Sequence, residues 1–578
     1  MQIRASGTVS AEGLRQAREL GFVARLAQHA SGSAAYSAVL GFRRGEPELL
    51  VMSNLQGLGS TLPAPFSKSA ESVLPLRLET SLQRDSMQPG PGGQLRLRDQ
   101  LTLDIGRMAS LAYVRDLSGP EPRVLRGSLG IGLSAQETVP VPDDGVAASI
   151  NLAALDLDAW NAVLAQAAGT SLTDNASGTA ALGYLPSSVA VRARELTLAG
   201  RRFNNVVVGG SRDGLLWRAN LDASELSGYL EYRAPSGSGA GRVYARLARL
   251  TIAANAASEV EALLSEQPAS VPALDIAVED FELRGKRLGR LEIEAVNRGP
   301  GTAGREATTR EWRLNKFNIS TPDAVLTASG NWASLNAQTV PELAGSGRGA
   351  PPRRRTVLNF KLDIADGGGL LNRLGMKDVV RRGRGKMEGQ IAWLGSPLSL
   401  DYPSMSGAFA INVESGQFLK AEPGIAKLLG VLSLQSLPRR LTLDFRDVFS
   451  DGFAFDFLRG DVVIEQGIAR TNNLQMQGVN AAVLMDGKAD FARETQDIKV
   501  VVVPEINAGT ASLIASVINP AVGIGTFLAQ LFLRRPLIEA ATQEFHIDGS
   551  WTDPKISKIE RKSNTDAAAA ARAREPGR

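Results

Sequence analysis

Apolar residues recur at every second position along most of this chain, and this spacing constrains the fold more than any other feature. In one segment, Leu101, Leu103 and Ile105 alternate with Thr102 and Asp104. A period of two places one face of a β-strand on apolar material and leaves the other face in water. Antiparallel sheets covered on a single side show this pattern. The chain is therefore expected to be built mainly from strands.

The alternation is clearest in the C-terminal half. Leu358, Phe360 and Leu362 alternate with Asn359 and Lys361, and a second run of this kind occupies residues 437–457. We interpret the apolar positions of both runs as the lining of one apolar surface. The predicted lining residues are Leu358, Phe360, Leu362, Leu441, Leu443, Phe445, Phe453, Phe455 and Phe457.

Length and composition indicate a repetitive architecture. At 578 residues the chain is larger than a single compact core normally grows. Its 59 glycines and 5% aromatic residues favour many turns and short strands over long helices. Strands spaced about 15 to 20 residues apart would number on the order of 30. We predict a mainly β fold: a long, highly twisted, repetitive antiparallel sheet that curls into an open hydrophobic groove, with a few short amphipathic helices, chiefly near the C-terminus.

An internal repeat supports this prediction. The sequence ELTLAGRRFNNVVV at 195–208 matches DFELRGKRLGRLEI at 280–293 in its pattern of two alternating runs joined by a glycine and basic residues. This pattern predicts a hairpin with the glycine at its turn. WRAN at 217–220 follows the first copy, and WRLN at 312–315 follows the second after a longer loop. Repetition indicates a sheet in which each unit contacts chiefly its neighbours.

Composition also predicts the division of the chain. A repetitive β-groove segment is expected at 1–340, with disordered insertions near 234–241 and 299–309. A disordered Gly/Pro/Arg-rich insertion at 341–355 separates it from a second β-groove region at 356–557, and a disordered tail is expected at 558–578. Helices are expected at 158–167, 370–374, 424–437 and 507–541.

Two of these helices could contact a membrane. The helix at 424–437 is amphipathic, and it either covers a core or docks on a membrane or on lipid tails. The uncharged run at 507–533 contains Asn519 and Pro520, and we interpret it as a broken helical hairpin on the end of the sheet or against a membrane surface. The apolar face of the helix at 424–437 comprises Ile425, Leu428, Leu429 and Leu432.

The sequence offers no catalytic, metal or cofactor constellation. Cysteine is absent, and His29 and His546 are the only histidines. Residues 130–135 match a G-x-G-x-x-A pattern, but Pro140 and Pro142 exclude the helix that a dinucleotide site needs. We predict that the protein is not an enzyme. The densest carboxylate cluster, interpreted as solvated strand and turn residues, is Asp444, Asp447, Asp451 and Asp456.

Charge and the N-terminus add two further expectations. The net charge is only +4, and no basic cluster is interleaved with aromatic residues, so nucleic acid is not an expected partner. The first seven residues form a strand pattern without the basic start and apolar core of an export signal. The sequence is therefore expected to begin within a domain.

Several segments resemble the YhdP family of AsmA-like proteins. They are residues 370–397, with LLNRLGMKDVVRRGRGKMEGQIAWLGSP, residues 416–456, which end in LPRRLTLDFRDVFSDGFAFD, and GSWTDPKI at 549–556. VMSNLQGLGSTLPAPFSK at 51–68 extends the resemblance toward the N-terminus. The resemblance covers nearly the whole chain, and the 437–457 motif is its most specific part.

The resemblance implies a periplasmic protein whose full-length form is anchored in the inner membrane by an N-terminal helix that is missing here. It also implies a hydrophobic groove that moves phospholipid toward the outer membrane and supports the permeability barrier of that membrane. The implied partners are phospholipid and, at the C-terminal end, a membrane surface or outer-membrane partner. The chain is expected to be monomeric.

Two functions remain open at this point. In the favoured one, a bridge-like lipid transfer protein shields acyl chains from water; at about 0.8 kcal/mol per methylene, exposing a 16-carbon chain costs about 13 kcal/mol. In the alternative, a non-enzymatic periplasmic scaffold for envelope biogenesis closes the same sheet around a dry core. The two differ in whether the apolar faces of successive strands stay open or meet an opposing layer.

Overall fold

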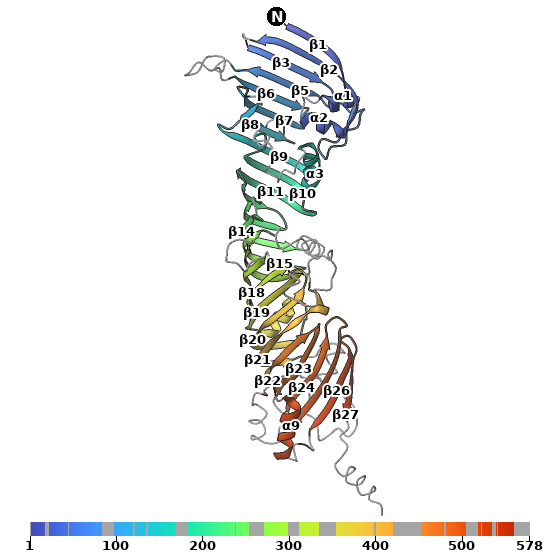
Figure 1. Ribbon diagram of the computed structural model, residues 1–578, viewed down its shortest axis with the longest axis vertical. Coiled ribbons are helices and arrows are strands. Elements are labelled where there is room, and N and C mark those ends of the chain that lie inside the picture. The colour runs from blue at the N-terminus through green and yellow to red at the C-terminus, as the bar shows by residue number, and fades with distance from the viewer. Residues whose placement is uncertain are drawn as a thin grey trace, which may run out of the picture. The chain divides into compact units, whose positions relative to one another are not determined.

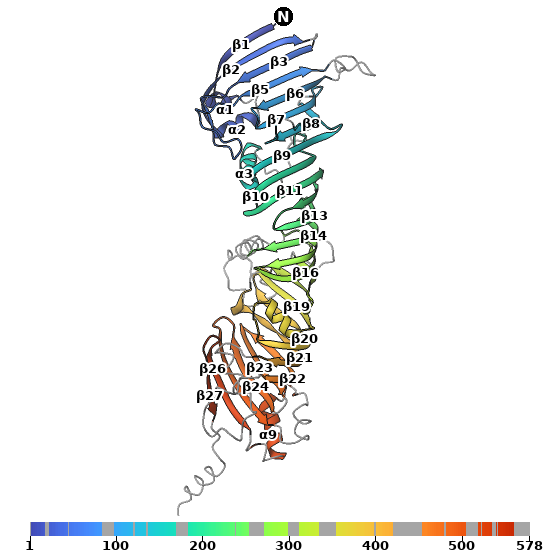
Figure 2. The same ribbon diagram turned by 180° about the vertical axis from the view of Figure 1, so that it is seen from behind.

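The computed structural model describes residues 2–17, 22–43, 46–83, 97–119, 122–134, 137–168, 183–236, 239–253, 271–298, 311–334, 354–397, 400–419, 453–478, 481–504, 518, 520–521, 523–534, 539 and 542–559. The 27 strands in this part of the chain belong to one mixed, mostly antiparallel sheet that is not closed. The chain divides into two compact units, which are described separately (Figures 1 and 2). Unit 1 comprises residues 1–259 and 272–279, and unit 2 comprises residues 260–271 and 280–578.

In unit 1, strands that follow one another in the sequence are neighbours in the sheet, except that β4 pairs with β2 and β3 pairs with β5. The predicted antiparallel pairing is confirmed except at β8, β9 and β10, which run parallel to one another. Parallel neighbours need a connection that returns the chain to the same end of the sheet, and residues 132–144 and 157–187 make these two returns. The strands are β1 (Gln2–Ser10), β2 (Ala30–Arg43), β3 (Glu46–Ser53), β4 (Leu58–Ser60), β5 (Leu76–Leu82), β6 (Arg98–Ile105), β7 (Ala109–Asp116), β8 (Arg123–Ile131), β9 (Gly145–Asp156), β10 (Ser188–Leu198), β11 (Arg201–Asp213), β12 (Leu216–Asp222), β13 (Leu226–Arg233) and β14 (Arg242–Ile252).

Unit 2 is an antiparallel meander from β16 to β27, in which each strand pairs with the next along the chain. Strand β15 (Ala273–Leu283) contains the division between the units. The strands of unit 2 are β16 (Lys286–Arg298), β17 (Glu311–Ser320), β18 (Ala324–Ser334), β19 (Arg354–Ile364), β20 (Val380–Leu394), β21 (Ser406–Phe418), β22 (Phe453–Glu465), β23 (Ile468–Gly478), β24 (Ala481–Asp490), β25 (Thr495–Pro504), β26 (Gln543–Ser550) and β27 (Pro554–Ile559).

The described helices are few and short. The predictions at 158–167 and 370–374 are confirmed by α3 (Leu157–Ala168) and α6 (Gly367–Arg373), and α9 (Gly523–Arg534) lies within the region predicted at 507–541. The helix predicted at 424–437 lies outside the described residues. The alternation pattern did not predict α1 (Ala11–Gln16), α2 (Phe22–Leu26) or the 3₁₀ turns η2 (Ala27–His29) and η5 (Tyr402–Ser404).

The hairpins of the internal repeat have the predicted turns. Ala199 and Gly200 join β10 to β11 with φ angles of 52° and 73°, and Arg284 and Gly285 join β15 to β16 with 51° and 74°. Two successive residues at positive φ form the turn that matches the twist of a two-residue hairpin. A helix contacts each hairpin: the Asp158 carboxylate of α3 accepts from the Ala199 and Gly200 amides, and α6 packs near the start of β16.

The predicted insertions are described only in part. Residues 234–236 and 239–241 lie in the connection between β13 and β14, where the Gly239 amide donates to the Ser236 carbonyl and Ala234 is buried. Residues 299–309 and most of 341–355 lie outside the described residues, as does the tail beyond Ile559. The proposed segment boundaries at 340 and 356 remain a prediction.

Candidate functional site: the apolar faces of the sheet

The register of β16 to β21 places apolar side chains in rows that cross six strands on one face. Because residues opposite one another in an antiparallel pair point to the same side, each row can be followed from strand to strand. Leu362, Phe360 and Leu358 each lie in a different row. The rows are Leu291–Ile319–Leu326–Leu362–Met387–Ile411, then Ile293–Phe317–Ala328–Phe360–Gly389–Phe409, and then Ala295–Leu314–Gly330–Leu358–Ile391–Gly407. We call these residues the apolar face of unit 2.

The opposite side of the same strands is polar. Asn359 and Lys361 lie between the predicted lining residues and are exposed. Lys361 forms an ion pair with Asp363 at 2.6 Å, and the Gln390 side-chain amide donates to Oδ1 of the Asn359 side chain at 2.7 Å. One side of β19 and β20 therefore faces water through charged and amide groups, as the alternation predicts.

The central part of the apolar face is incompletely covered. Leu358, Phe360 and Leu362 are each only partly buried, and so are Phe317, Leu326, Met387 and Ile411. The rings of Phe360 and Phe409 lie 6.4 Å apart, with Gly389 between them in the register. Half-exposed leucine and phenylalanine side chains in continuous rows give a surface that can accept acyl chains without first unpacking a core.

One end of these strands is closed by tryptophan. Trp312, Trp332 and Trp393 lie in one row, in which Thr356 stands between the last two, and all three indoles are at most 7% exposed. The Trp393 indole donates to the Ser396 carbonyl at 2.9 Å. Trp312 belongs to the WRLN motif, but the motif alone does not indicate this row, because the row depends on pairing with β18 and β20.

The two phenylalanines predicted at 455 and 457 point to different faces. Phe455 is 4% exposed and packs against Phe418, with ring centroids 5.3 Å apart, and against Leu458. Phe457 instead lies under the Arg459 guanidinium, which is 4.1 Å from its ring centroid. The register of β22 on β23 shifts between Phe455 and Phe457, and a bulge of this kind reverses the alternation.

The structure does not describe the side chains of the other predicted residues. Phe453 begins β22, but its side chain is not among those described. The remaining positions lie outside the described residues, so their placement stays a prediction. They are Leu441, Leu443 and Phe445 of the lining, Ile425, Leu428, Leu429 and Leu432 of the helix, and three of the four cluster carboxylates, Asp444, Asp447 and Asp451.

The terminal strands of unit 2 are packed on both sides. On one side, Val483, Val500 and Val502 are at most 1% exposed in a cluster with Phe455 and Ile547. On the other side, Val501 and Val503 pack under α9 through Ile524, Leu528 and Leu531. The apolar side of the sheet is therefore partly exposed at the centre of β17 to β21 and mostly buried at β24 and β25.

Unit 1 has an apolar face of the same kind. Its members are Leu49, Val51, Leu76, Leu78, Leu101, Leu103, Leu111, Leu129, Ala148, Ile150, Val191, Val208 and Leu221. Two aromatic side chains from the connection between β9 and β10 cover part of it. Trp160 of α3 packs on the cluster of Ala193 and Val206, and Tyr184 packs on Tyr113 with ring centroids 5.2 Å apart. Burial, and then the neighbouring Tyr184, raise the pKa of the Tyr113 hydroxyl.

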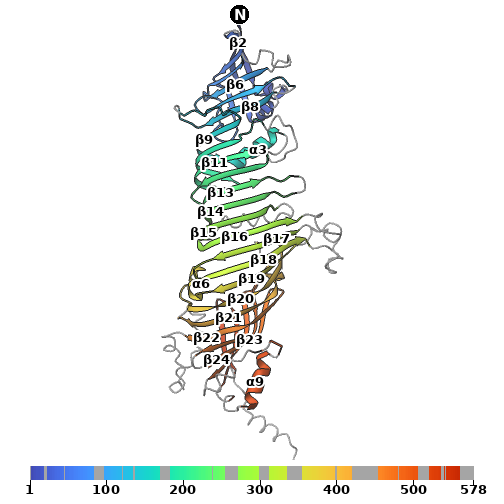
Figure 3. The same cartoon turned by 90° about the vertical axis from the view of Figure 1, so that its left-hand side faces the viewer.

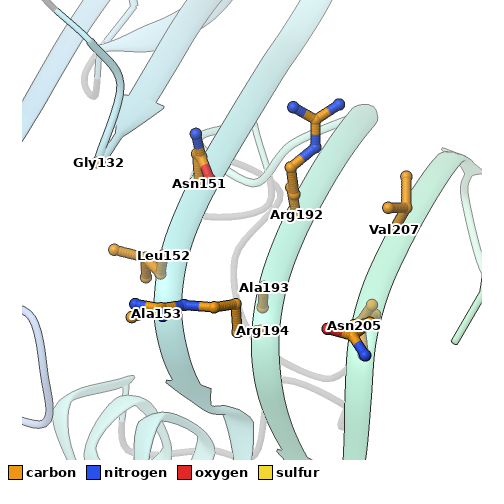
Figure 4. Close-up of a pocket in the computed structure, with 10 residues that line it drawn as sticks. Gly132, Asn151, Leu152, Ala153, Arg192, Ala193, Arg194, Asn205 and Val207 are labelled. Carbon is orange, nitrogen blue, oxygen red and sulfur yellow. The ribbon is translucent and has the colours of Figure 1, made fainter. Parts of the chain in front are cut away.

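The cavities of unit 1 do not form an enclosed catalytic pocket. One has a volume of about 460 Å³ and is lined by exposed Arg192, Arg194, Asn151 and Asn205 (Figure 4). These four side chains lie on strands β9 to β11, with the two arginines on the middle strand. The second, of about 600 Å³, is open and includes Arg77 among its lining residues. Neither contains a histidine.

Histidine and acidic side chains are scattered rather than clustered. Among the described residues, no group of three or more histidine or acidic side chains could hold a metal ion. His546 lies on the polar side of β26, with its Nε2 atom 3.6 Å from carboxylates of Asp497 and Asp548. His29 ends the 3₁₀ turn η2. Within the described segments, no helix has the length and apolar content to cross a bilayer.

Comparison with known proteins identifies the family of this chain. A curated relative from Escherichia coli (strain K12), named intermembrane phospholipid transporter YhdP, is 26% identical over 285 residues. That alignment covers 49% of this chain and 20% of the relative, so the chain spans a minor part of the relative's length. The family described as YhdP protein matches residues 1–556. The resemblance expected from the sequence motifs is thus confirmed, and the chain belongs to the YhdP family.

Proposed function

We propose that this chain carries phospholipid between the inner and outer membranes, with acyl chains on the apolar face and headgroups in solvent. The observation that supports the proposal most is the set of three rows that run in register across β16 to β21 and whose central leucine and phenylalanine side chains are partly exposed. Each methylene placed on such a surface avoids about 0.8 kcal/mol of hydration cost. The E. coli relative's name supports phospholipid as the cargo.

The route we propose uses many strands rather than a single site. Neighbouring strands are about 4.8 Å apart, so a chain lying across the rows always contacts two or more strands. Moving by one strand exchanges one set of leucine and phenylalanine contacts for a similar set. Movement of this kind needs no catalytic group, and the route supports the permeability barrier of the outer membrane by supplying lipid to it.

A scaffold remains the second candidate because of the terminal strands. Val483, Val500 and Val502 form a closed hydrophobic core, as expected for a part of the sheet whose role is structural. We therefore place the proposed route over β16 to β21 and assign β24 to β27 a structural role. In full-length relatives we expect a periplasmic location with an inner-membrane anchor.

Residue-by-residue photo-crosslinking tests the proposal. A photoreactive phenylalanine analogue is placed in turn at Leu358, Asn359, Phe360, Lys361 and Leu362, and phospholipid adducts are detected after irradiation of cells with radiolabelled phosphate. Adducts at 358, 360 and 362 but not at 359 and 361 are expected, because the side chains alternate between the two faces. Equal labelling at all five positions, or no lipid adduct at any of them, would favour the scaffold.

A further inference from the structure

A group of cations lies at one end of the strands in unit 2. Lys286 begins β16, and Lys377 precedes β20. Arg381, Arg382 and Arg384 are among the first five residues of β20. We call these five residues the basic rim. Within the described part of the chain, no carboxylate lies within 4.0 Å of any of their charged groups, although ion pairs are frequent elsewhere on this sheet.

The helix α6 brings the members of the basic rim together. Figure 3 shows α6 beside the ends of β18 and β20. The Arg373 guanidinium of α6 forms an ion pair with Asp323 at 2.7 Å and donates to the Arg287 carbonyl at 3.1 Å, which fixes the helix against β16 and β18. The loop after α6 contacts Lys286, since a Cβ atom added to Gly375 would clash with the Lys286 ammonium. Positive charge from β16 and β20 is therefore concentrated beside one helix.

Nearby acidic groups do not neutralise this charge. Asp378 follows Lys377, and Glu414 is opposite Arg384 in the register of β20 on β21. Glu282 and Asp323 are engaged by Arg287 and Arg373, which are not part of the rim. Counting the five cations against Asp366 at the N-terminus of α6, Asp378 and Glu414 leaves a net charge of 5 − 3 = +2.

The basic rim borders apolar side chains. Leu374 and Met376, in the loop after α6, are 44% and 47% exposed. On the apolar side, Ile364 of β19 is opposite Gly385, and Met387 belongs to the apolar face two residues later; Arg384, which directly precedes Gly385, points to the polar side at the edge of this face. Exposed cations next to a partly open apolar surface match an amphiphile with an anionic head, because guanidinium groups bind phosphate oxygens in pairs.

We infer that the basic rim binds the phosphate of an anionic phospholipid whose acyl chains lie on the adjacent apolar face. The inference deepens the proposed function and rests on it, since it names where the headgroup is held and which headgroups are favoured. The rim would hold a lipid with net negative charge more tightly than a zwitterionic one. It would also give the cargo an orientation, because the opposite end of these strands carries the tryptophan row.

The test compares two charge-reversal variants of this chain. Arg381→Glu with Arg384→Glu changes the rim, and Arg192→Glu with Arg194→Glu is the matched control, since all four arginines are exposed and each variant changes the net charge equally. Arg382 is left unchanged because its φ of 62° makes substitution a backbone perturbation. Binding of short-chain phosphatidylglycerol and phosphatidylcholine, both below their micelle concentrations, is measured by calorimetry at low and high salt, with inorganic phosphate and phosphatidylglycerol vesicles as further ligands.

The expected result is a loss of at least tenfold in affinity for phosphatidylglycerol in the rim variant, little change for phosphatidylcholine, and wild-type behaviour in the control. Equal binding of both lipids by the wild type, unaffected by the rim variant, overturns the rim site and leaves the proposed function standing. Binding of inorganic phosphate as tight as that of the lipid shows a free-phosphate site and overturns the inference, as does binding to vesicles without binding to monomeric lipid. No binding of either lipid overturns both proposals.

Discussion

Replacing Phe360 with aspartate should block lipid binding without unfolding the sheet. Phe360 is only partly buried, and its ring centroid lies 6.4 Å from that of Phe409. Loss of an aromatic pair and of some apolar burial costs about 1–2 kcal/mol of stability, which a chain with many strand contacts tolerates. The matched control is Asn359→Asp, which adds the same charge on the polar side and keeps an acceptor for the Gln390 amide.

The effect on binding can be estimated from the register. Phe360 is opposite Ala328 on one neighbouring strand and Gly389 on the other. A hydrated carboxylate at this position excludes an acyl chain from the surface within about one strand spacing on each side, a width of about 10 Å in total. If about four methylenes lose contact at about 0.8 kcal/mol each, the cost is about 3 kcal/mol and the affinity falls about 200-fold.

Calorimetric titration with a short-chain phospholipid measures this affinity, and circular dichroism melting checks the fold of both variants. We expect wild-type affinity for Asn359→Asp and a large loss for Phe360→Asp. Unchanged binding by a folded Phe360→Asp protein would refute the assignment of the acyl chains to this face. Phe455 is a poorer probe, because its 4% exposure makes a charge there a folding defect.

Three further predictions concern stability. Phe455→Ala should lower the free energy of unfolding by about 3–5 kcal/mol in urea titration, because the ring is enclosed in the terminal core; a loss below about 1 kcal/mol would contradict that burial. Asp99→Asn should cost about 3 kcal/mol, because it leaves the largely buried Arg115 guanidinium without its carboxylate, whereas a neutral result would show that water reaches the pair. The hydrogen bond from Lys316 lowers the pKa of the Glu292 carboxyl, so its small contribution to stability is present above the usual glutamate pKa and is lost as the pH falls through the lowered value. Glu292→Gln should therefore unfold with a weaker pH dependence in acid than the wild type, and identical acid titrations would contradict this.

Alternation alone was sufficient to predict much of the fold. It identified the strands, the hairpins of the repeat, and the face shared by Leu358, Phe360 and Leu362, because a one-residue slip would expose every one of these side chains. It placed Phe457 wrongly beside Phe455, since a bulge depends on the partner strand and leaves little local trace. The parallel steps at β8 to β10 also had no signal, because strand direction is set by what long connections pack against.

Some features could have been found by a different reading of the residues. Val500 to Val503 form a continuous apolar run, which is typical of a strand covered on both faces, and α9 supplies the second cover. Four of the five residues of the basic rim lie within a segment used for the family resemblance, but their position beside Lys286 depends on the loop that follows α6. Charge gathered from separate strands is not visible in a linear pattern.

The parallel strands of unit 1 have a consequence for anything that moves along its sheet. The chain leaves β9 at Asp156 at one end of the strands and re-enters at Ser188 at the other, and both Trp160 after the exit and Tyr184 before the return pack on the apolar side. The Tyr113 hydroxyl donates to the Tyr184 carbonyl at 3.2 Å and ties the returning segment down. Trp160 and Tyr184 therefore cover part of the apolar face between β7 and β11, so less of its width is open there than if both connections lay on the polar side.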